Sequence, residues 1–390
     1  MGAFTSFHPL MAKSDLRHAS LALASVFAVN GSYFGAWATR IPDTKARFDL
    51  SADQLGLLLL LLAIGSIVSF PYAGRFVDRL GARAATMWTL PYYVLTLIII
   101  GIAPNLWVLG LGLALFGSSH GSMDVAMNAW GAEVERKVGK PILGRFHALY
   151  SLGAGIGAAI GAATIGMGLS TATHLVSFAL ITGGLLWLFG RSKWQSVIPE
   201  NSAKAPMIAW PKGPLLLVGL AALASAIGEG SMFDWGALFT LDRVASSTAQ
   251  AALGLTVFSI TMVIVRIFSG EIVGRLGAEK SIILSGLFAL AGVLICLVAT
   301  GLWQIYVGFA IMGLGYSLIF PLAFSRAGND PNLPAGQAMA QVATLGYGGM
   351  LLGPPLIGFL TERGGFNLSF GFIALLAATI MFLGRGFKSK

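Results

Sequence analysis

The sequence predicts an all-α integral membrane protein with twelve transmembrane helices in two pseudo-symmetric six-helix bundles, and three observations support this. Of the 390 residues, 56% are hydrophobic and only 11% are charged, against roughly a quarter charged in soluble proteins. The apolar residues run in stretches of about 20, the length of a helix that crosses a bilayer. The two halves of the chain also repeat each other. This composition excludes a soluble enzyme and a disordered chain, and apolar runs of that length exclude a porin-type barrel.

Windows of helix length place the spans in order along the chain. They fall near residues 20–40, 54–74, 84–103, 106–130, 143–167, 172–190, 214–239, 250–272, 281–300, 303–325, 336–360 and 367–384. The longest polar connection separates spans six and seven. We therefore expect an N-terminal bundle over 1–190, a cytoplasmic central loop over 191–212 and a C-terminal bundle over 213–390. Because Lys13, Asp15 and Arg17 precede the first apolar run, we expect no cleaved signal peptide.

The basic residues predict the orientation in the membrane. If both termini are cytoplasmic, 18 of the 25 lysines and arginines fall in inner segments and 5, Arg40 among them, fall in outer segments. This asymmetry follows the positive-inside rule and accounts for the net charge of +9 without nucleic acid. The single cysteine, Cys296, allows neither a disulfide nor a Cys-based metal site. With no Walker loop either, the sequence predicts no cofactor, no metal and no direct use of ATP.

A repeat with a spacing of 196 residues relates the two halves. The segment 74–83 (GRFVDRLGAR), after span two, returns as 270–278 (GEIVGRLGA), after span eight. Leu106-Trp107 in span four returns as Leu302-Trp303 in span ten at the same offset. Repeats of the same topology predict two bundles related by an axis along the membrane normal, with a site between them at the midplane.

The segment 74–83 resembles the G-x3-D-R-x-G-R signature between helices two and three of the major facilitator superfamily. The chain is similar to a bacterial inner-membrane branch near the fucose-permease and rhizopine-permease groups. The resemblance implies two bundles that rock about a midplane site, and a gate at the signature. Its gating residues would be Gly74, Asp78, Arg79, Gly81 and Arg83. Asp78 would accept hydrogen bonds from a neighbouring helix end when the inner gate closes, unless these charges only mark a solvated loop.

Placing a charged residue inside a membrane costs free energy, so each such residue is a candidate for a functional role or for an ion pair. His120, Asp124 and Asn128 recur every four residues in span four and therefore form one polar stripe. Burial favours the neutral form of a carboxyl group, which suits proton coupling. We predict Asp124 as the first candidate for proton coupling and Glu229 in span seven as the second. The alternatives are a structural hydrogen-bond network for the stripe and a structural pair with Arg266 for Glu229.

Polar and aromatic side chains in span one indicate a binding site for a hydroxylated solute. Asn30, Tyr33 and Trp37 supply an amide, a phenol and an indole at helical spacing, although Trp37 could instead belong to an interfacial belt. Further candidates for solute contact are His120, Asn128, Asp234 and Tyr316, the last being the repeat equivalent of His120. Arg145 and Arg266 could neutralise Asp124 or bind an anionic substrate, and the sequence leaves this open.

Together these features predict a secondary active transporter and not an enzyme. The motif Gly117-x-Ser119-x-Gly121 lies inside an apolar helix, where the strand and strained turn of a hydrolase are absent. The expected partners are a small sugar- or polyol-like solute, protons and membrane lipid, with no nucleic acid, and the expected state is a monomer. The alternatives are a proton-driven exporter of amphipathic drugs or metabolites and a non-transporting membrane sensor.

Overall fold

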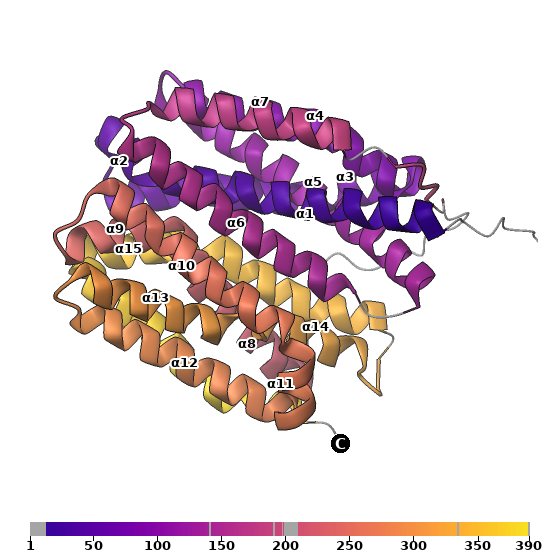
Figure 1. Ribbon diagram of the computed structural model, residues 1–390. Helices are drawn as coiled ribbons and strands as arrows, with labels where there is room; N and C mark the ends of the chain where they lie inside the picture. The colour runs from indigo at the N-terminus through magenta and orange to yellow at the C-terminus, as the bar shows by residue number, and fades with distance from the viewer. Residues whose placement is uncertain are drawn as a thin grey trace, which may run out of the picture.

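The computed structural model describes residues 13–139, 142–189, 192–196, 198, 210–333 and 335–388. Within these residues the chain is helical, with short connections (Figure 1). The helices are α1 Lys13–Thr39, α2 Ile41–Arg47, α3 Ala52–Leu80, α4 Ala82–Ile102, α5 Leu106–Val138, α6 Leu143–Gly166, α7 Thr171–Phe189, α8 Pro214–Asp234, α9 Gly236–Arg243, α10 Thr248–Ile267, α11 Ser269–Leu276, α12 Ala278–Val298, α13 Leu302–Tyr316, α14 Ile319–Gly328 and α15 Ala335–Leu383. A short 3-10 helix, Gly384–Phe387, follows them.

The prediction of twelve transmembrane helices is confirmed. The described residues contain 11 helical segments long and apolar enough to cross a membrane. The last of them, Gln341–Phe387, holds two helices, because the backbone leaves helical geometry at Gly364 and Gly365. Several helices extend past the predicted boundaries, as α5 does to Val138. The spans expected at 214–239, 250–272 and 303–325 are each divided into two helices, at Trp235, Phe268 and Ser317.

The internal repeat is visible in the local geometry of the helix ends. Ser51 and Ser247, 196 residues apart, both begin a helix with a reciprocal capping box, with Gln54 and Gln250 as the third residue of the turn. Gly81 and Gly277, also 196 apart, both end the signature segment with a positive φ, +81° and +78°. A positive φ strains residues with a Cβ, so glycine is required at this break in both copies.

The helices α1 to α7 lie together in one part of the molecule and α8 to α15 in the other (Figure 1). We call these parts the N-half and the C-half. They contact each other mainly through α6 with α10 and through α3 with α15, whereas α4 and α7 pack against other helices of the N-half. The domain limits at residues 190 and 213 stay a prediction, since most of the central loop, 191–212, lies outside the described residues.

Close packing of α1 against α6 gives the N-half a tight interior. A Cβ added at Gly31 would collide with the carbonyl oxygen of Tyr150, and one at Gly153 would collide with that of Ala28. The glycines of α6 therefore bring two backbones into contact, as small residues do between membrane helices. Near the middle of α6, the carbonyl of Gly155 accepts a hydrogen bond of 3.2 Å from the Thr256 hydroxyl of α10.

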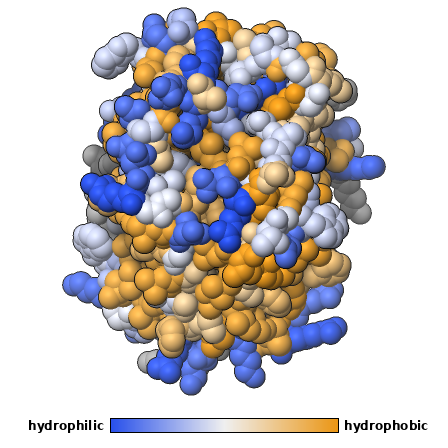
Figure 2. Space-filling model, turned by 90° about the vertical axis from the view of Figure 1, so that its left-hand side faces the viewer, coloured by the Kyte–Doolittle hydropathy of each residue, from blue (hydrophilic) through white to orange (hydrophobic). Residues whose placement is uncertain are grey.

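The two halves meet closely at the end of the molecule that carries α2 and α9, which we call the α2 end. There the backbone N–H of Ala52 donates to the Glu362 carboxylate at 2.9 Å. A Cβ at Gly56 would lie 2.8 Å from the carbonyl oxygen of Pro354, so α3 and α15 touch through their backbones. Figure 2 looks onto the α2 end. Hydrophilic side chains gather in the upper part of this view, and mostly hydrophobic side chains lie below them.

The opposite end carries residues 74–83, and we call it the signature end. A Cβ placed at Gly74, Gly270 or Gly274 would meet nothing within 4 Å. The two copies of the signature segment therefore do not pack against each other or against a third helix at these glycines. Among the described residues, the halves are in contact at the α2 end and show no close approach at these three glycines of the signature end.

A buried arginine organises the N-half at the α2 end. Only 2% of Arg40 is exposed. Its Nε donates to His174 Nδ1 at 3.0 Å, and its guanidinium also reaches Asp43 at 2.6 Å, Thr164 at 3.2 Å and the Leu169 carbonyl at 3.0 Å. Arg40 lies in the turn between α1 and α2, and its side chain is buried because the bends after α1 and α6 enclose it. Its assignment to an outer segment stays a prediction.

Candidate functional site

The polar stripe of span four lies on α5 as expected. His120, Asp124 and Asn128 are all partly buried. The Asn128 amide donates to the Asp124 carboxylate at 3.0 Å and to the Asp124 carbonyl at 2.8 Å. His120 Nδ1 lies 2.8 Å from the hydroxyl of Tyr93 on α4. No described residue forms an ion pair with Asp124, and Arg145, one of the two predicted neutralising residues, is exposed.

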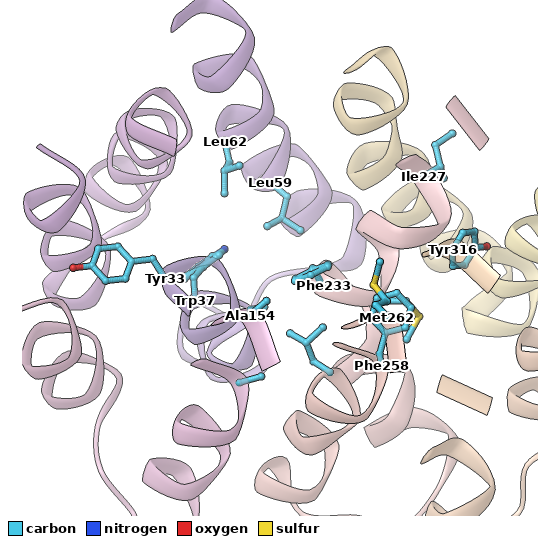
Figure 3. Close-up of a cluster of buried hydrophobic side chains, with 14 of the residues drawn as sticks. Tyr33, Trp37, Leu59, Leu62, Ala154, Ile227, Phe233, Phe258, Met262 and Tyr316 are labelled. Atoms are coloured by element: carbon cyan, nitrogen blue, oxygen red, sulfur yellow. The ribbon is translucent and has the colours of Figure 1, made fainter. Parts of the chain in front are cut away.

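The span-one candidates on α1 separate into different environments. Asn30 is buried; its amide group contacts the Met127 sulfur at 3.5 Å, and its side-chain oxygen has no partner among the described residues. Trp37 is also buried, and the described part of the chain offers its indole N–H no acceptor. Figure 3 shows Trp37 near the junction with the C-half. The two side chains thus retain hydrogen-bonding atoms that the protein leaves unused.

The expected contact between Tyr33 and a solute does not agree with its placement. Tyr33 is fully buried inside the N-half, and its hydroxyl donates to the Ala179 carbonyl of α7 at 2.9 Å. In Figure 3 it points away from Phe233 and the C-half. A spacing of three residues turns Tyr33 about 60° from Asn30 around the helix. That rotation is enough to direct it to α7, so Tyr33 has a structural role.

The sequence analysis missed Phe34, which occupies the place expected for Tyr33. Its ring lies 5.2 Å from that of His120 and 5.2 Å from that of Phe233 on α8. Phe34 therefore joins the α5 stripe to the C-half. Its spacing of four residues from Asn30, which puts the two on one helix face, is the signal that could have identified it.

Glu229 and Arg266 form an ion pair in the C-half, which is the alternative that the sequence left open. Their side chains lie 3.4 Å apart and are 19% and 10% exposed. Arg266 Nε also donates to the Ser317 carbonyl at 3.2 Å. A further guanidinium nitrogen donates across the junction to the hydroxyl of Ser151 on α6. Arg266 thus links the two halves.

Tyr150 of α6 lies near charged groups of both halves. Asp124, Glu229 and Arg266 are close enough to act on the charge of its hydroxyl, and no described hydrogen bond joins them to it. Its ring centroid is 6.3 Å from that of His120. Tyr347 of α15 also lies within electrostatic range of Asp124, and its ring packs at a tilt of 51° against that of Phe70 on α3, with ring centroids 4.8 Å apart. One cluster at the junction of the halves therefore contains a carboxyl group from each half.

Asp234 and Tyr316, both candidates for solute contact, differ in their surroundings. Asp234 is partly buried, and no described residue hydrogen-bonds to its carboxyl group. Tyr316 is fully buried, and a Cβ added at Gly228 would collide with its hydroxyl. Figure 3 shows that hydroxyl pointing away from the N-half. Tyr316 therefore fills space inside the C-half, contrary to the expectation of solute contact, because α8 lies over its ring.

The signature residues form no latch in this structure. Asp78 is partly buried and Arg79 is exposed, and neither pairs with a described residue of the C-half. The backbone N–H of Arg83 donates to the Ser196 hydroxyl at 2.9 Å, and Ser196 also packs against Gly81. The Arg83 side chain lies on the outer surface of the N-half, beside Trp88 and Trp187. Arg83 therefore does not point toward the C-half, as a gating residue would.

Comparison with known proteins agrees with this architecture. The family model described as Major Facilitator Superfamily matches residues 20–347 and 245–388, which together span nearly all of the chain. The chain belongs to the major facilitator superfamily. It is therefore a multi-pass membrane transporter and not an enzyme, and the family binds small-molecule substrates.

One relative and two solved structures illustrate how similar this transporter is to known members. It is 41% identical over 362 residues to the transporter y4wD of Sinorhizobium fredii, covering 93% of this chain and 96% of the relative. The nucleoside transporter NupG matches with a TM-score of 0.73 and 15% identity, over 95% of this chain and 100% of NupG. The fucose:proton symporter FucP of E. coli matches with a TM-score of 0.62 and 17% identity, over 95% and 98%. The two structures establish the fold.

Proposed function

We propose that this transporter moves a small hydroxylated solute, sugar- or polyol-like, across the bacterial inner membrane by alternating access, coupled to protons and as a monomer. The observation that carries the proposal is the cluster at the junction of the halves. It places Asp124 of the N-half and Glu229 of the C-half around one tyrosine, Tyr150. A carboxyl group that gains or loses a proton there changes the charge at the surface between the two moving parts.

Asp124 is the better candidate for the group that carries the proton. Glu229 already has Arg266 as an ionic partner, whereas the only side chain that hydrogen-bonds to Asp124 among the described residues is the neutral Asn128. A carboxylate without a counter-ion in a low-dielectric site is costly, so protonation of Asp124 relieves a larger penalty. The Glu229–Arg266 pair is better suited to holding the halves through Ser151.

The surrounding side chains suit a hydroxylated solute. Asn30 and Trp37 have an unused acceptor and an unused donor, and His120, Asn128 and Asp234 supply further polar atoms. Phe34 supplies an apolar ring face. Sites for sugars and nucleosides combine such edge hydrogen bonds with aromatic surfaces. The names of two structural relatives, a fucose:proton symporter and a nucleoside transporter, favour the same class of solute.

The basic residues of the connecting segments orient the transporter in the proposal. With the signature end and both termini in the cytoplasm, the α2 end faces the outside. The contacts between α3 and α15 then close the outer side, and solute exchanges with the cytoplasm. When the inner side closes instead, Asp78 with Arg79 at the signature end would bind the approaching helix end of the C-half.

Replacing Glu362 by glutamine is expected to favour opening at the α2 end. The Glu362 carboxylate accepts from the first N–H of α3, where the helix dipole favours negative charge. Loss of that charge removes about 0.3–1 kcal/mol and shifts the population toward the open α2 end by about two- to fivefold. Spin labels on α2 and α9 would report the change as a longer distance component.

Asp242 on α9 provides the control for this prediction, since it is an exposed carboxylate at the same end and no described residue pairs with it. Asp242→Asn should leave the distance distribution between α2 and α9 unchanged. Equal distributions for Glu362→Gln and the unmodified transporter would show that the carboxylate does not hold the α2 end together.

Thermal unfolding of the purified transporter with a panel of solutes tests the substrate class. A ligand at about a hundred times its dissociation constant stabilises by roughly 2.7 kcal/mol. We expect a neutral hydroxylated solute to raise the melting temperature and Asn128→Ala to abolish the shift. Asn332→Ala, at an exposed loop position, should preserve it. Stabilisation by lipophilic cations alone would contradict the proposal and favour the drug exporter.

A further inference from the structure

Two open grooves run along the outer surface of the N-half on either side of Trp88. One, of about 330 Å³, lies between α4 and α7 and is lined by Arg83, Ala84, Met87, Trp88 and Trp187. The other, of about 310 Å³, is lined by α3, α4 and α5, with Tyr72, Phe76, Tyr92 and Ser122 among its walls. Trp88 lines both grooves and is 64% exposed. It therefore forms a ridge between the two grooves.

These grooves face lipid. The helices α4 and α7 pack against other N-half helices, so their outer faces lie away from the junction with the C-half. The side chains exposed there are large and apolar or aromatic: Tyr72 is 66% exposed and Trp187 is 44% exposed. In a transmembrane protein such a surface contacts acyl chains, and tryptophan and tyrosine gather at headgroup depth.

Arg83 is the single charged residue that lines the grooves among those that the structure describes. It lies in the first turn of α4, next to the signature end, and no described carboxylate pairs with it. Its Nε is shielded from solvent and has no hydrogen-bond acceptor in the described part of the chain. A guanidinium beside a lipid-facing surface, with no described carboxylate as its partner, can bind an anionic group through its terminal nitrogens, and the bilayer supplies one as phosphate.

We propose that this surface binds one anionic diacyl phospholipid. Arg83 donates to its phosphate, and the two acyl chains lie in the grooves on either side of Trp88. Basic pockets between transmembrane helices bind anionic headgroups in this way. The exposed Arg75 and Arg79 at the same end add positive potential, which favours an anionic over a zwitterionic lipid. The site is independent of the solute pathway.

Native mass spectrometry of the purified full-length transporter, titrated with dioleoyl phosphatidylglycerol, tests the proposal. We expect one lipid to bind before the rest, and Arg83→Gln to weaken that binding by about fivefold, the effect of one basic residue near a headgroup. Arg75→Gln is the matched control, because it removes an equal charge at the same end outside the grooves. Arg83→Lys, which keeps the charge, should retain most of the affinity.

Three results would overturn the proposal. The first is equal affinity of Arg83→Gln and Arg75→Gln for phosphatidylglycerol. The second is equal affinity of the unmodified transporter for dioleoyl phosphatidylcholine. The third is full displacement of the lipid by glycerol 1-phosphate at comparable concentration, which would indicate a site for a free anion. Weakened binding in Trp88→Leu would instead support the proposal, because the ridge separates the chains.

Discussion

Substitution of Asp124 by asparagine is expected to abolish gradient-driven accumulation while exchange of labelled solute continues. Asparagine keeps the size of the side chain and an oxygen that can accept from Asn128, but it cannot take up a proton. A gradient of one pH unit corresponds to about 1.4 kcal/mol, which supports roughly tenfold accumulation for one proton per solute. In the variant the ratio should fall to about one. Uptake into proteoliposomes, with and without an imposed pH gradient, measures it.

The controls for Asp124→Asn separate proton coupling from folding. Asp242→Asn, on the exposed surface of α9, should accumulate solute normally. Glu229→Gln should lower the exchange rate as well as accumulation, because it disturbs the Arg266 link to Ser151. Unchanged concentrative uptake in Asp124→Asn would eliminate Asp124 as the proton carrier, and loss of coupling in Glu229→Gln alone would transfer that role to Glu229.

Arg40→Met is expected to cause the largest loss of stability among these variants, about 3 kcal/mol or more. The substitution fills part of the space but leaves Asp43, Thr164 and the Leu169 carbonyl without the donors that now satisfy them. The main cost is the loss of hydrogen bonds from the charged guanidinium to enclosed acceptors such as His174 Nδ1, because the Asp43 carboxylate is 32% exposed and water can partly solvate it. Reversible unfolding in mixed micelles would measure the change in free energy.

Arg47→Met on the same short helix is the control, because Arg47 is exposed and its guanidinium contacts only the ring of Phe48 among the described groups. Its effect should stay within about 0.5 kcal/mol. A loss below 1 kcal/mol for Arg40→Met would indicate that water replaces the guanidinium, and that the Arg40 network contributes little to holding α1, α6 and α7 together.

The fold follows from features that are local in sequence. The length of each apolar stretch predicts a transmembrane helix. The helix-capping residues and the signature glycines recur 196 residues apart, once in each half. The ends of the helices were harder to predict than the spans. The helix α5, for example, continues beyond its apolar stretch to Arg136 and Lys137, because arginine and lysine are good helix formers although they are charged. Neither helix that begins after the breaks at Trp235 and Ser317 has a side-chain cap hydrogen bond, and no proline stands at either break.

The candidate site was predictable where it depends on the period of a single helix. His120, Asp124 and Asn128 share a face because four residues make about one turn. The position of Tyr33 and the pairing of Arg40 with His174 depend instead on which helix lies opposite. His174 is 134 residues from Arg40 in the sequence. No periodicity within one helix contains that information.

The contact of α6 with α10 has a mechanical consequence. Gly155 stands at the middle of Leu143–Gly166, and its partner Thr256 stands close to the middle of Thr248–Ile267. Because glycine packing binds α6 firmly to α1, the alternating access proposed above would turn the N-half as one rigid body about this point. A small tilt about such a fulcrum separates the halves at one end by about as much as it brings them together at the other, so both ends cannot stand open at once.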